Sequence, residues 1–449
     1  MKKFLSLALA AIMCMSLLAG CGDSAAEDDG AADEGGEATT IQVAAVSTAF
    51  TDAYPQMWSE IAAAFEEATG IKVDLIEEKN LEDVIGPAMQ SGSFPDVVYL
   101  PLGRPAALTE QFVKDKNITE ITDVLDMTVP GEDAKVSDKL VGGYVRDGSQ
   151  TNPYNDGKTY LAPMFYDPVG LFYNAGLFAE KGWEVPTTWD EMWELGDKAA
   201  AEGIYLFTYP TTGYFDCFIP QLLSVVGGPE FFEKVTHYEE GIWETPEADQ
   251  YFALLAKLAT YTHPITPAQA NDQDFSQNQQ LILDNKALFI PNGTWLPGEM
   301  ADAPRADGFE WGMCATPALT EGGDSYAYSW FQQVWIPAGA ENVDSAKQFV
   351  AFLYSDAACE IFLKGGAVQP VVGVADTLEG EKKAFFSIFD NGAKTAMGGF
   401  ATTESVAGLG TEREIYRDPM NGLVSGQITI DDWKSDIIEA NDILREHMM

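Results

Sequence analysis

Three short stretches near the start of the chain decide the fold: Ile41-Gln-Val-Ala-Ala-Val46, Ile71-Lys-Val-Asp-Leu75 and Asp96-Val-Val-Tyr-Leu100. Each is a strand candidate, because apolar and β-branched residues dominate it. The segments between them have helical spacing, one from about Pro55 to a stop at Gly70 and one over 81–90. This βαβαβ order predicts a parallel sheet covered by helices on both faces. Ligands of such sheets bind at the carboxyl ends of the strands, which are 47–54 and 101–104 here.

The same alternation of strand and helix restarts later, which predicts two α/β lobes rather than one large sheet. Residues 160–174 are expected to hold two short extended runs around Tyr166-Asp-Pro168. Thr188 and Glu191 form a capping box, which opens a helix that precedes a strand at 204–209. The remaining expectations are helices over 343–354, 356–364 and 431–447, and surface loops over 264–280 and 320–325.

The first residues have the features of an export signal. Lys2 and Lys3 precede an apolar run over 4–20, which ends in Leu18-Ala-Gly-Cys21. That string resembles the lipobox of bacterial lipoproteins, which implies a signal peptide over 1–20 and a lipid on Cys21. The alternative is an uncleaved N-terminal anchor helix. Residues 21–40 are rich in Gly, Ala, Asp and Glu and contain no aromatic residue, so they are expected to form an acidic flexible tether.

Composition excludes some classes of protein. The 449 residues include 70 acidic and 26 basic side chains, for a net charge of −44. Such a field repels phosphate backbones, so no nucleic-acid partner is expected. The histidines, His237, His263 and His447, do not have the spacing of a metal site, and neither a metal nor a cofactor is expected.

The cysteines that remain after the signal, Cys217, Cys314 and Cys359, are odd in number and far apart. This excludes a disulfide scaffold. One bridge stays open, but three buried free thiols are the preferred interpretation.

Common catalytic motifs are absent from the sequence. There is no P-loop, no dinucleotide fingerprint, no zinc-protease motif and no nucleophile elbow. A pair of carboxylates for glycoside hydrolysis stays open, because a sequence does not give the distance between two side chains.

Seven segments along the chain, taken in order and spacing, carry a resemblance to a known family. They are Phe65-Glu-Glu-Ala-Thr-Gly-Ile-Lys-Val73, Phe94-Pro-Asp-Val97, Asp156-Gly-Lys-Thr-Tyr-Leu-Ala-Pro163, Leu171-Phe-Tyr-Asn174, Pro186-Thr-Thr-Trp-Asp-Glu191, Lys286-Ala-Leu-Phe289 with Asn292-Gly-Thr-Trp295, and Ala346-Lys-Gln-Phe-Val-Ala-Phe-Leu353. Together they resemble the family 1 extracellular solute-binding proteins of ABC importers, which include maltose-binding protein. The resemblance extends over nearly all of 41–449.

The resemblance implies an α/β fold of the type II periplasmic-binding-protein kind. Its two lobes, each a mixed sheet flanked by helices, are joined by a hinge, and the ligand binds in the cleft between them. The first lobe is expected over 41–165 and 332–380, and the second over 166–325 and 395–449. The hinge crossovers are placed near 165, 325–332 and 380–400.

The resemblance also implies which residues contact the ligand. A sugar needs carboxylates for its hydroxyls and flat aromatic rings for its C–H face. The implied contacts are Asp167, Tyr214, Phe215, Asp216 and Trp295 in the second lobe, Tyr328, Trp330 and Phe331 at a crossover, and Ser47, Thr48, Gly103 and Arg104 in the strand-end loops of the first lobe.

Each implied contact has a competing structural interpretation. Asp167 precedes Pro168, so it would serve equally to start a turn, and Trp295 would serve equally as a core residue. Other tryptophans are assigned to packing or the core. These are Trp183, Trp189, Trp193, Trp243, Trp335 and Trp433.

The resulting hypothesis is a carbohydrate-binding protein of an ABC importer, without catalysis. It is expected to be a monomer that is lipid-anchored at Cys21 on the extracellular face of a Gram-positive cell membrane, and its partners would be the permease transmembrane subunits. Segments 100–105 and 180–189 look similar to binders of N-acetylglucosamine and chitobiose. Two alternatives stay open: a polyamine or other cationic-ligand-binding protein, and a secreted glycoside hydrolase.

Overall fold

The computed structural model describes residues 39–448 except 103, 105, 142–150, 155, 402 and 404–405. Its first strands, β1 (Thr40–Val46), β2 (Lys72–Glu78) and β3 (Val97–Tyr99), pair in parallel in the order β2-β1-β3. The helices between them are α2 (Met57–Thr69), which ends at Gly70 in the left-handed conformation, and α3 (Leu81–Gln90). The predicted βαβαβ unit is confirmed. It forms the centre of the first lobe.

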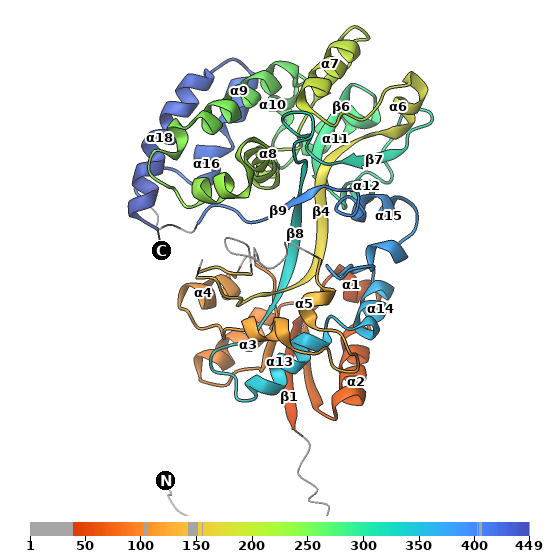
Figure 1. Ribbon diagram of the computed structural model, residues 1–449, viewed down its shortest axis with the longest axis vertical. Coiled ribbons are helices and arrows are strands. Elements are labelled where there is room, and N and C mark those ends of the chain that lie inside the picture. Colours follow the sequence, from red (N-terminus) through yellow and green to blue (C-terminus); the bar gives the residue numbers. More distant parts are fainter. Residues whose placement is uncertain are drawn as a thin grey trace, which may run out of the picture. The chain divides into compact units, whose positions relative to one another are not determined.

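Two long strands run between the lobes (Figure 1). β4 (Ala162–Asn174) and β8 (Tyr326–Trp335) pair antiparallel, β3 pairs with β8, and β6 (Ala287–Gly293) pairs with β4. These strands therefore form a single mixed sheet, in which the strand order is β2-β1-β3-β8-β4-β6-β5. The prediction of two separate sheets is wrong, because the crossover strands bond to both halves. The two expected runs over 160–174 are one strand, whose register shifts between Pro163 and Tyr166.

The second lobe is built on β5 (Tyr205–Phe207), β6 and β7 (Trp311–Cys314). Its helix α7 (Trp189–Ala200) begins at the predicted capping box of Thr188 and Glu191. The expected closing helix is α18 (Ile430–Glu446), whose buried residues include Trp433, Ile437, Ala440 and Leu444, as its spacing predicts.

The predicted surface loop over 264–280 is wrong, because α10 (Thr266–Gln269) and most of α11 (Phe275–Leu283) lie there. The polar residues that suggested a loop are partly buried: Asn278 is 0% exposed, and its amide donates to the carbonyl oxygens of Pro210 and Thr266. Asn and Gln side chains in a sequence suggest a surface loop, but they also occur in the interior, where their amides donate hydrogen bonds to buried carbonyl oxygens.

The other elements complete the two lobes. They are α1 (Ala49–Ala53), α4 (Leu108–Lys114), α5 (Val136–Lys139), α6 (Ala175–Lys181), α8 (Phe215–Thr236), α9 (Pro246–Tyr261), α12 (Leu296–Glu299), α13 (Val343–Phe352), α14 (Asp356–Lys364), α15 (Gly380–Phe386), α16 (Glu412–Tyr416), α17 (Pro419–Val424), β9 (Lys394–Ala396) and the 3₁₀ turns η1 (Thr122–Asp126), η2 (Thr212–Tyr214), η3 (Ile242–Glu244) and η4 (Ala375–Thr377).

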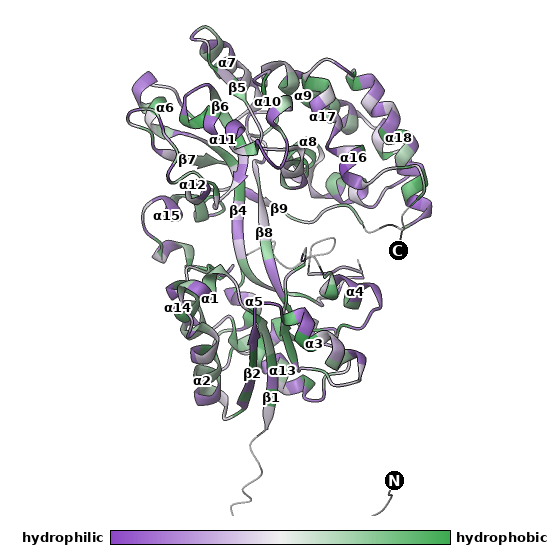
Figure 2. Ribbon diagram, turned by 180° about the vertical axis from the view of Figure 1, so that it is seen from behind, coloured by the Kyte–Doolittle hydropathy of each residue, from purple (hydrophilic) through white to green (hydrophobic). Residues whose placement is uncertain are grey.

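Two large hydrophobic cores stabilise the lobes. Trp243, Trp335 and Trp433 are core residues, with at most 2% of each exposed, and Trp189 and Trp193 are buried against each other. β1 of the first lobe is mostly apolar, whereas β4 and β8 carry hydrophilic residues where they pass between the lobes in Figure 2. This change from apolar to polar marks the segment that positions the candidate site.

The cysteines of the described part of the chain are unpaired. Cys217 and Cys359 are buried as expected, but Cys314 is only half-buried. Within the described residues, no helix has the length and apolar character needed to cross a membrane.

Candidate functional site

The floor of the candidate site is formed where β4 and β8 lie side by side. Their register places Asp167 opposite Trp330 and Val169 opposite Tyr328. Because residues two apart on a strand share a face, these four side chains project to the same side of the ladder. Tyr328 is only 3% exposed, whereas Trp330 and Asp167 are half-buried. The pairing therefore leaves one indole and one carboxylate accessible on a polar stretch of the ladder.

The wall beside this floor comes from the second lobe. β6 ends at Gly293, and the chain then turns through Thr294 and Trp295 into α12. A Cβ atom at position 293 would lie 2.1 Å from the Trp295 ring, so a glycine at this position allows the indole to pack against the backbone of residue 293. Trp295 and Trp330 both pack on a small cluster of Val169, Cys217 and Tyr328. Residues as distant in the sequence as Val169, Cys217 and Trp330 therefore meet at one place.

Tyr214 completes the wall from the end of η2, at the start of α8. It is half-buried. Burial raises the pKa of its hydroxyl to about 12, Glu299 acts in the same direction, and a hydrogen bond with the side chain of Trp295 opposes them. Tyr214 and Trp295 are therefore neighbours. We call Tyr214, Trp295 and Trp330 the aromatic wall.

Asp167 is the carboxylate beside the aromatic wall. Its Oδ1 accepts a hydrogen bond from the Thr294 hydroxyl at 2.6 Å. Burial raises the pKa of Asp167 above its usual range, while the Thr294 hydrogen bond and the positive charge of Lys382 act in the opposite direction. Asp167 does not merely start a turn, since it lies within a continuous strand.

The predicted residues of the first lobe have protein partners already. Ser47 donates to Glu77 Oε1 at 3.3 Å, and Thr48 caps α1 by accepting from the Phe50 N–H. Arg104 pairs with both carboxylate oxygens of Glu82. We call Ser47, Thr48 and Arg104 the polar edge. Gly103, predicted with them, lies outside the described residues, as does Cys21.

Two of the predicted aromatic contacts have buried side chains. Phe215 is 0% exposed and packs edge-on against Tyr209 and Phe218. Phe331 is 1% exposed and belongs to a large hydrophobic core. Adjacent residues on a strand face opposite ways, so Phe331 turns inward because Trp330 turns outward.

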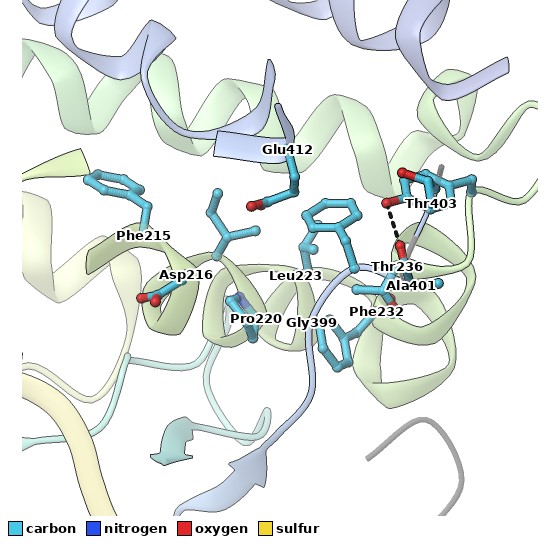
Figure 3. A pocket seen from close by; sticks show the side chains of 13 residues that line it. Phe215, Asp216, Pro220, Leu223, Phe232, Thr236, Gly399, Ala401, Thr403 and Glu412 are labelled. Carbon is cyan, nitrogen blue, oxygen red and sulfur yellow. Dashed lines mark hydrogen bonds between the residues drawn. The ribbon is translucent and has the colours of Figure 1, made fainter. Parts of the chain in front are cut away.

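Asp216 follows Tyr214 by two residues and lies in the first turn of α8. Its carboxylate is exposed, 3.8 Å from the Arg417 guanidinium. It lines a cavity of about 250 Å³ together with Phe215, Phe232 and Phe400. Figure 3 shows that α8 supplies one side of this cavity and Glu412 the opposite side. Residues 215, 216, 219, 220 and 223 all line it and share one face of α8, whereas Cys217 packs toward Tyr328 on another face.

Sequence reasoning missed residues that complete the site. Thr294 binds Asp167, and Tyr99 of β3 donates to Gln332 of β8, on the same strand face as Trp330. Thr294 belongs to Asn292-Gly-Thr-Trp295, so its position next to Trp295 in the sequence could have indicated that it lies in the site. Gln332 follows Trp330 by two positions, but only the pairing of β8 reveals a shared face. Among the described residues, no three His, Cys, Asp or Glu side chains gather as metal ligands.

Comparison with known proteins identifies the family. The family model of the bacterial extracellular solute-binding proteins matches residues 60–384. The chain is 31% identical to the diacetylchitobiose binding protein NgcE of Streptomyces coelicolor over 155 residues, which are 34% of this chain and only about a third (32%) of that relative. It is 22% identical over 375 residues to the maltooligosaccharide ABC transporter solute-binding lipoprotein of Streptococcus pneumoniae, covering 76% of this chain and 74% of that one.

Comparison with solved structures identifies the fold. The apo form of RafE from Streptococcus pneumoniae superimposes with a TM-score of 0.62 at 17% identity, covering 90% of this chain and 99% of that structure. At this identity the likeness establishes the fold, and the predicted two-lobed type II architecture is confirmed. The family match covers well over half of the chain. The chain therefore belongs to the bacterial extracellular solute-binding proteins.

Proposed function

We propose that this protein captures a carbohydrate, a mono- or oligosaccharide, between its lobes and delivers it unaltered to the permease subunits of an ABC importer. The observation that carries the proposal is the meeting of the aromatic wall with Asp167. A sugar presents an apolar C–H face that packs on flat rings, and hydroxyls that donate to a carboxylate. The half-buried state of Trp295, Trp330 and Asp167 leaves both kinds of group accessible.

The relatives support this substrate class by their names. One is named for diacetylchitobiose and another for maltooligosaccharides. The first name supports a test of diacetylchitobiose, in agreement with the resemblance of segments 100–105 and 180–189 to binders of N-acetylglucosamine and chitobiose. Both names describe binding rather than turnover, so no catalytic step is proposed.

The proposed mechanism is hinge closure, with the ligand selecting the closed form. The lobes would be 41–165 with 332–380 and 166–325 with 395–449, and the crossovers would lie near 165, 325–332 and 380–400. The register shift between Pro163 and Tyr166 supports bending near the first crossover. A sugar shifts the population only by its differential affinity for the two forms, so it must contact both lobes.

We also propose that the mature chain is held at the extracellular face of the cell membrane by a lipid on Cys21, after removal of residues 1–20, with 21–40 as the tether. The relative from Streptococcus pneumoniae is named a lipoprotein, which supports this proposal. Expression of the full chain with Cys21→Ser tests it. The variant should leave the membrane fraction for the medium, and a variant that stays membrane-bound would contradict the anchor.

A panel of neutral saccharides, spermidine and a chromogenic oligosaccharide tests the function. Thermal melting identifies ligands, calorimetry at two salt concentrations gives affinity, and X-ray scattering reports closure. A neutral sugar should bind stoichiometrically, without dependence on salt, and should compact the protein. Salt-dependent binding of spermidine alone would indicate a cationic ligand, and release of chromophore would indicate a glycoside hydrolase. Either result, or no uptake of any saccharide, would overturn the proposal.

A further inference from the structure

Thr294 and Asp167 are brought together by the pairing of β4 with β6. Val169 lies opposite Gly293 in this ladder, so the next residue after β6 reaches the stretch of β4 that holds Asp167. The Thr294 hydroxyl donates to Oδ1 at 2.6 Å, which is a short hydrogen bond of the kind formed with a charged acceptor. Within the described residues, no protein donor contacts Oδ2. One oxygen is thus held by the protein, and the other is left for a ligand.

The surroundings of Asp167 make this hydrogen bond important. Burial away from water favours the protonated form of a carboxylate, whereas hydrogen-bond donors and positive charges favour its ionised form. The polar and titratable groups that interact with Asp167 are Lys382 from α15, Tyr99 from β3, Tyr166 from its own strand and Thr294 from the β6–α12 turn. Among them, Thr294 donates directly to the carboxylate, while Lys382 acts through charge alone. The two tyrosines supply no positive charge.

Thr294 also ties the carboxylate to the aromatic wall. It is followed at once by Trp295, and Gly293 before it accommodates the Trp295 ring. The turn that fixes the indole therefore fixes the hydroxyl that binds Asp167. An aromatic ring and a carboxylate recognise one sugar only when their relative orientation is set in advance, since ordering them upon binding reduces affinity.

We infer that Thr294 is a positioning residue, which keeps Asp167 ionised and turns its Oδ2 toward the hydroxyls of a bound saccharide. This inference rests on the proposed function for the identity of the ligand. Its structural part concerns the ligand-free protein and can be tested without any sugar.

The first experiment follows tryptophan fluorescence during acid titration of the full chain. Asp167 lies opposite Trp330 and beside the turn of Trp295, so its protonation should change the emission. Thr294→Val, which keeps the shape and removes the donor, should raise the midpoint of this transition. Thr294→Ser should keep the wild-type midpoint, and Asp167→Asn should abolish the transition. Equal midpoints in wild type and Thr294→Val, or a transition that persists in Asp167→Asn, would overturn the inference.

The second experiment measures affinity by calorimetry, using the saccharide that stabilises the wild type most. Near neutral pH, Thr294→Val should bind about tenfold to a hundredfold more weakly, since a hydrogen bond to a charged group is lost. Thr294→Ser should bind nearly as the wild type does. The matched control is Thr208→Val, which removes a buried hydroxyl that pairs with Thr266 at 2.8 Å instead. Wild-type affinity in Thr294→Val, or an equal loss in the control, would contradict the inference.

The two experiments separate the inference from the proposed function. If the midpoint shifts in Thr294→Val but no variant binds any saccharide, the proposed function fails while the control of Asp167 by Thr294 stands. If saccharides bind the wild type and Thr294→Val equally well at every pH, the proposed function stands and the inference fails.

Discussion

The aromatic wall and the polar edge differ in how many of their side chains are already bound to other groups of the protein. Trp295 and Trp330 are half-buried, and Asp167 keeps one oxygen without a protein donor among the described residues. At the polar edge, by contrast, Thr48 caps a helix and the Arg104 guanidinium is held by Glu82. A side chain of the right type binds a ligand only when its hydrogen-bonding capacity is not already filled. Most of the binding energy is therefore expected from the aromatic wall.

The largest effect that would test this comparison is expected from Trp295→Ala. Removal of the stacking ring should lower saccharide affinity by about a hundredfold or more, as loss of a central aromatic residue does at other binding sites. Melting should stay cooperative, because Trp295 is not part of either large core. Calorimetry measures the change. Trp183→Ala is the control, since that half-buried ring packs against Phe178 at 6.0 Å instead. Unchanged affinity in Trp295→Ala would refute the assignment of the wall.

A smaller but still large effect is expected from Gly293→Ala. The new Cβ would lie 2.1 Å from the Trp295 ring, so the indole must move. Affinity should fall by about tenfold or more, with a change in tryptophan emission. Gly298→Ala is the matched control, since a Cβ there meets no atom within 4 Å. If Gly293→Ala bound sugar normally, the position of Trp295 would not matter for binding.

Asp167→Asn tests the carboxylate through the pH dependence of stability. Burial raises the folded-state pKa of Asp167, so the ionised group destabilises the fold. The wild type should therefore gain stability relative to Asp167→Asn as the pH falls through that pKa, and lose this gain as the pH rises. Urea unfolding at several pH values measures the difference. Parallel stability curves for the two proteins would contradict the burial of the charge.

The smallest effect is expected from Arg104→Ala. Its guanidinium already bonds to Glu82 and to the carbonyl oxygen of Lys79, so little of its hydrogen-bonding capacity is left for a ligand. Saccharide affinity should change by less than about threefold, by calorimetry. A loss as large as that of Trp295→Ala would show that the polar edge and the aromatic wall contribute equally, and the comparison would have to be abandoned.

Local signals predicted many elements correctly. The bounds of α3 and α14 agree with the predicted 81–90 and 356–364. The capping box at Thr188 and the stop at Gly70 are also confirmed. Such features depend on interactions within a few residues, so a sequence contains all the information they need.

Predictions that required distant contacts succeeded less often. Residues 264–280 were predicted to form a loop but hold α10 and most of α11, and the buried Asn278 amide donates to the carbonyl oxygens of Pro210 and Thr266. Phe215 and Phe331 are buried although their neighbours are accessible, and Thr294 was not predicted to meet Asp167. These outcomes depend on strand register and on which face of an element is covered, which no local pattern specifies.

By itself, the sequence determined the parallel first lobe, the order of strands and helices, and the residue types that a sugar requires, because hydrophobic periodicity and helix caps act over short distances. The tertiary structure alone decided that β4 and β8 join both halves in one ladder, and that Asp167, Tyr214, Trp295 and Trp330 meet while Arg104 is occupied by Glu82. The physical reason is that a side chain can bind a ligand only if the protein leaves its surface or its hydrogen-bonding groups available. Which groups stay available is decided only when distant segments of the chain pack together.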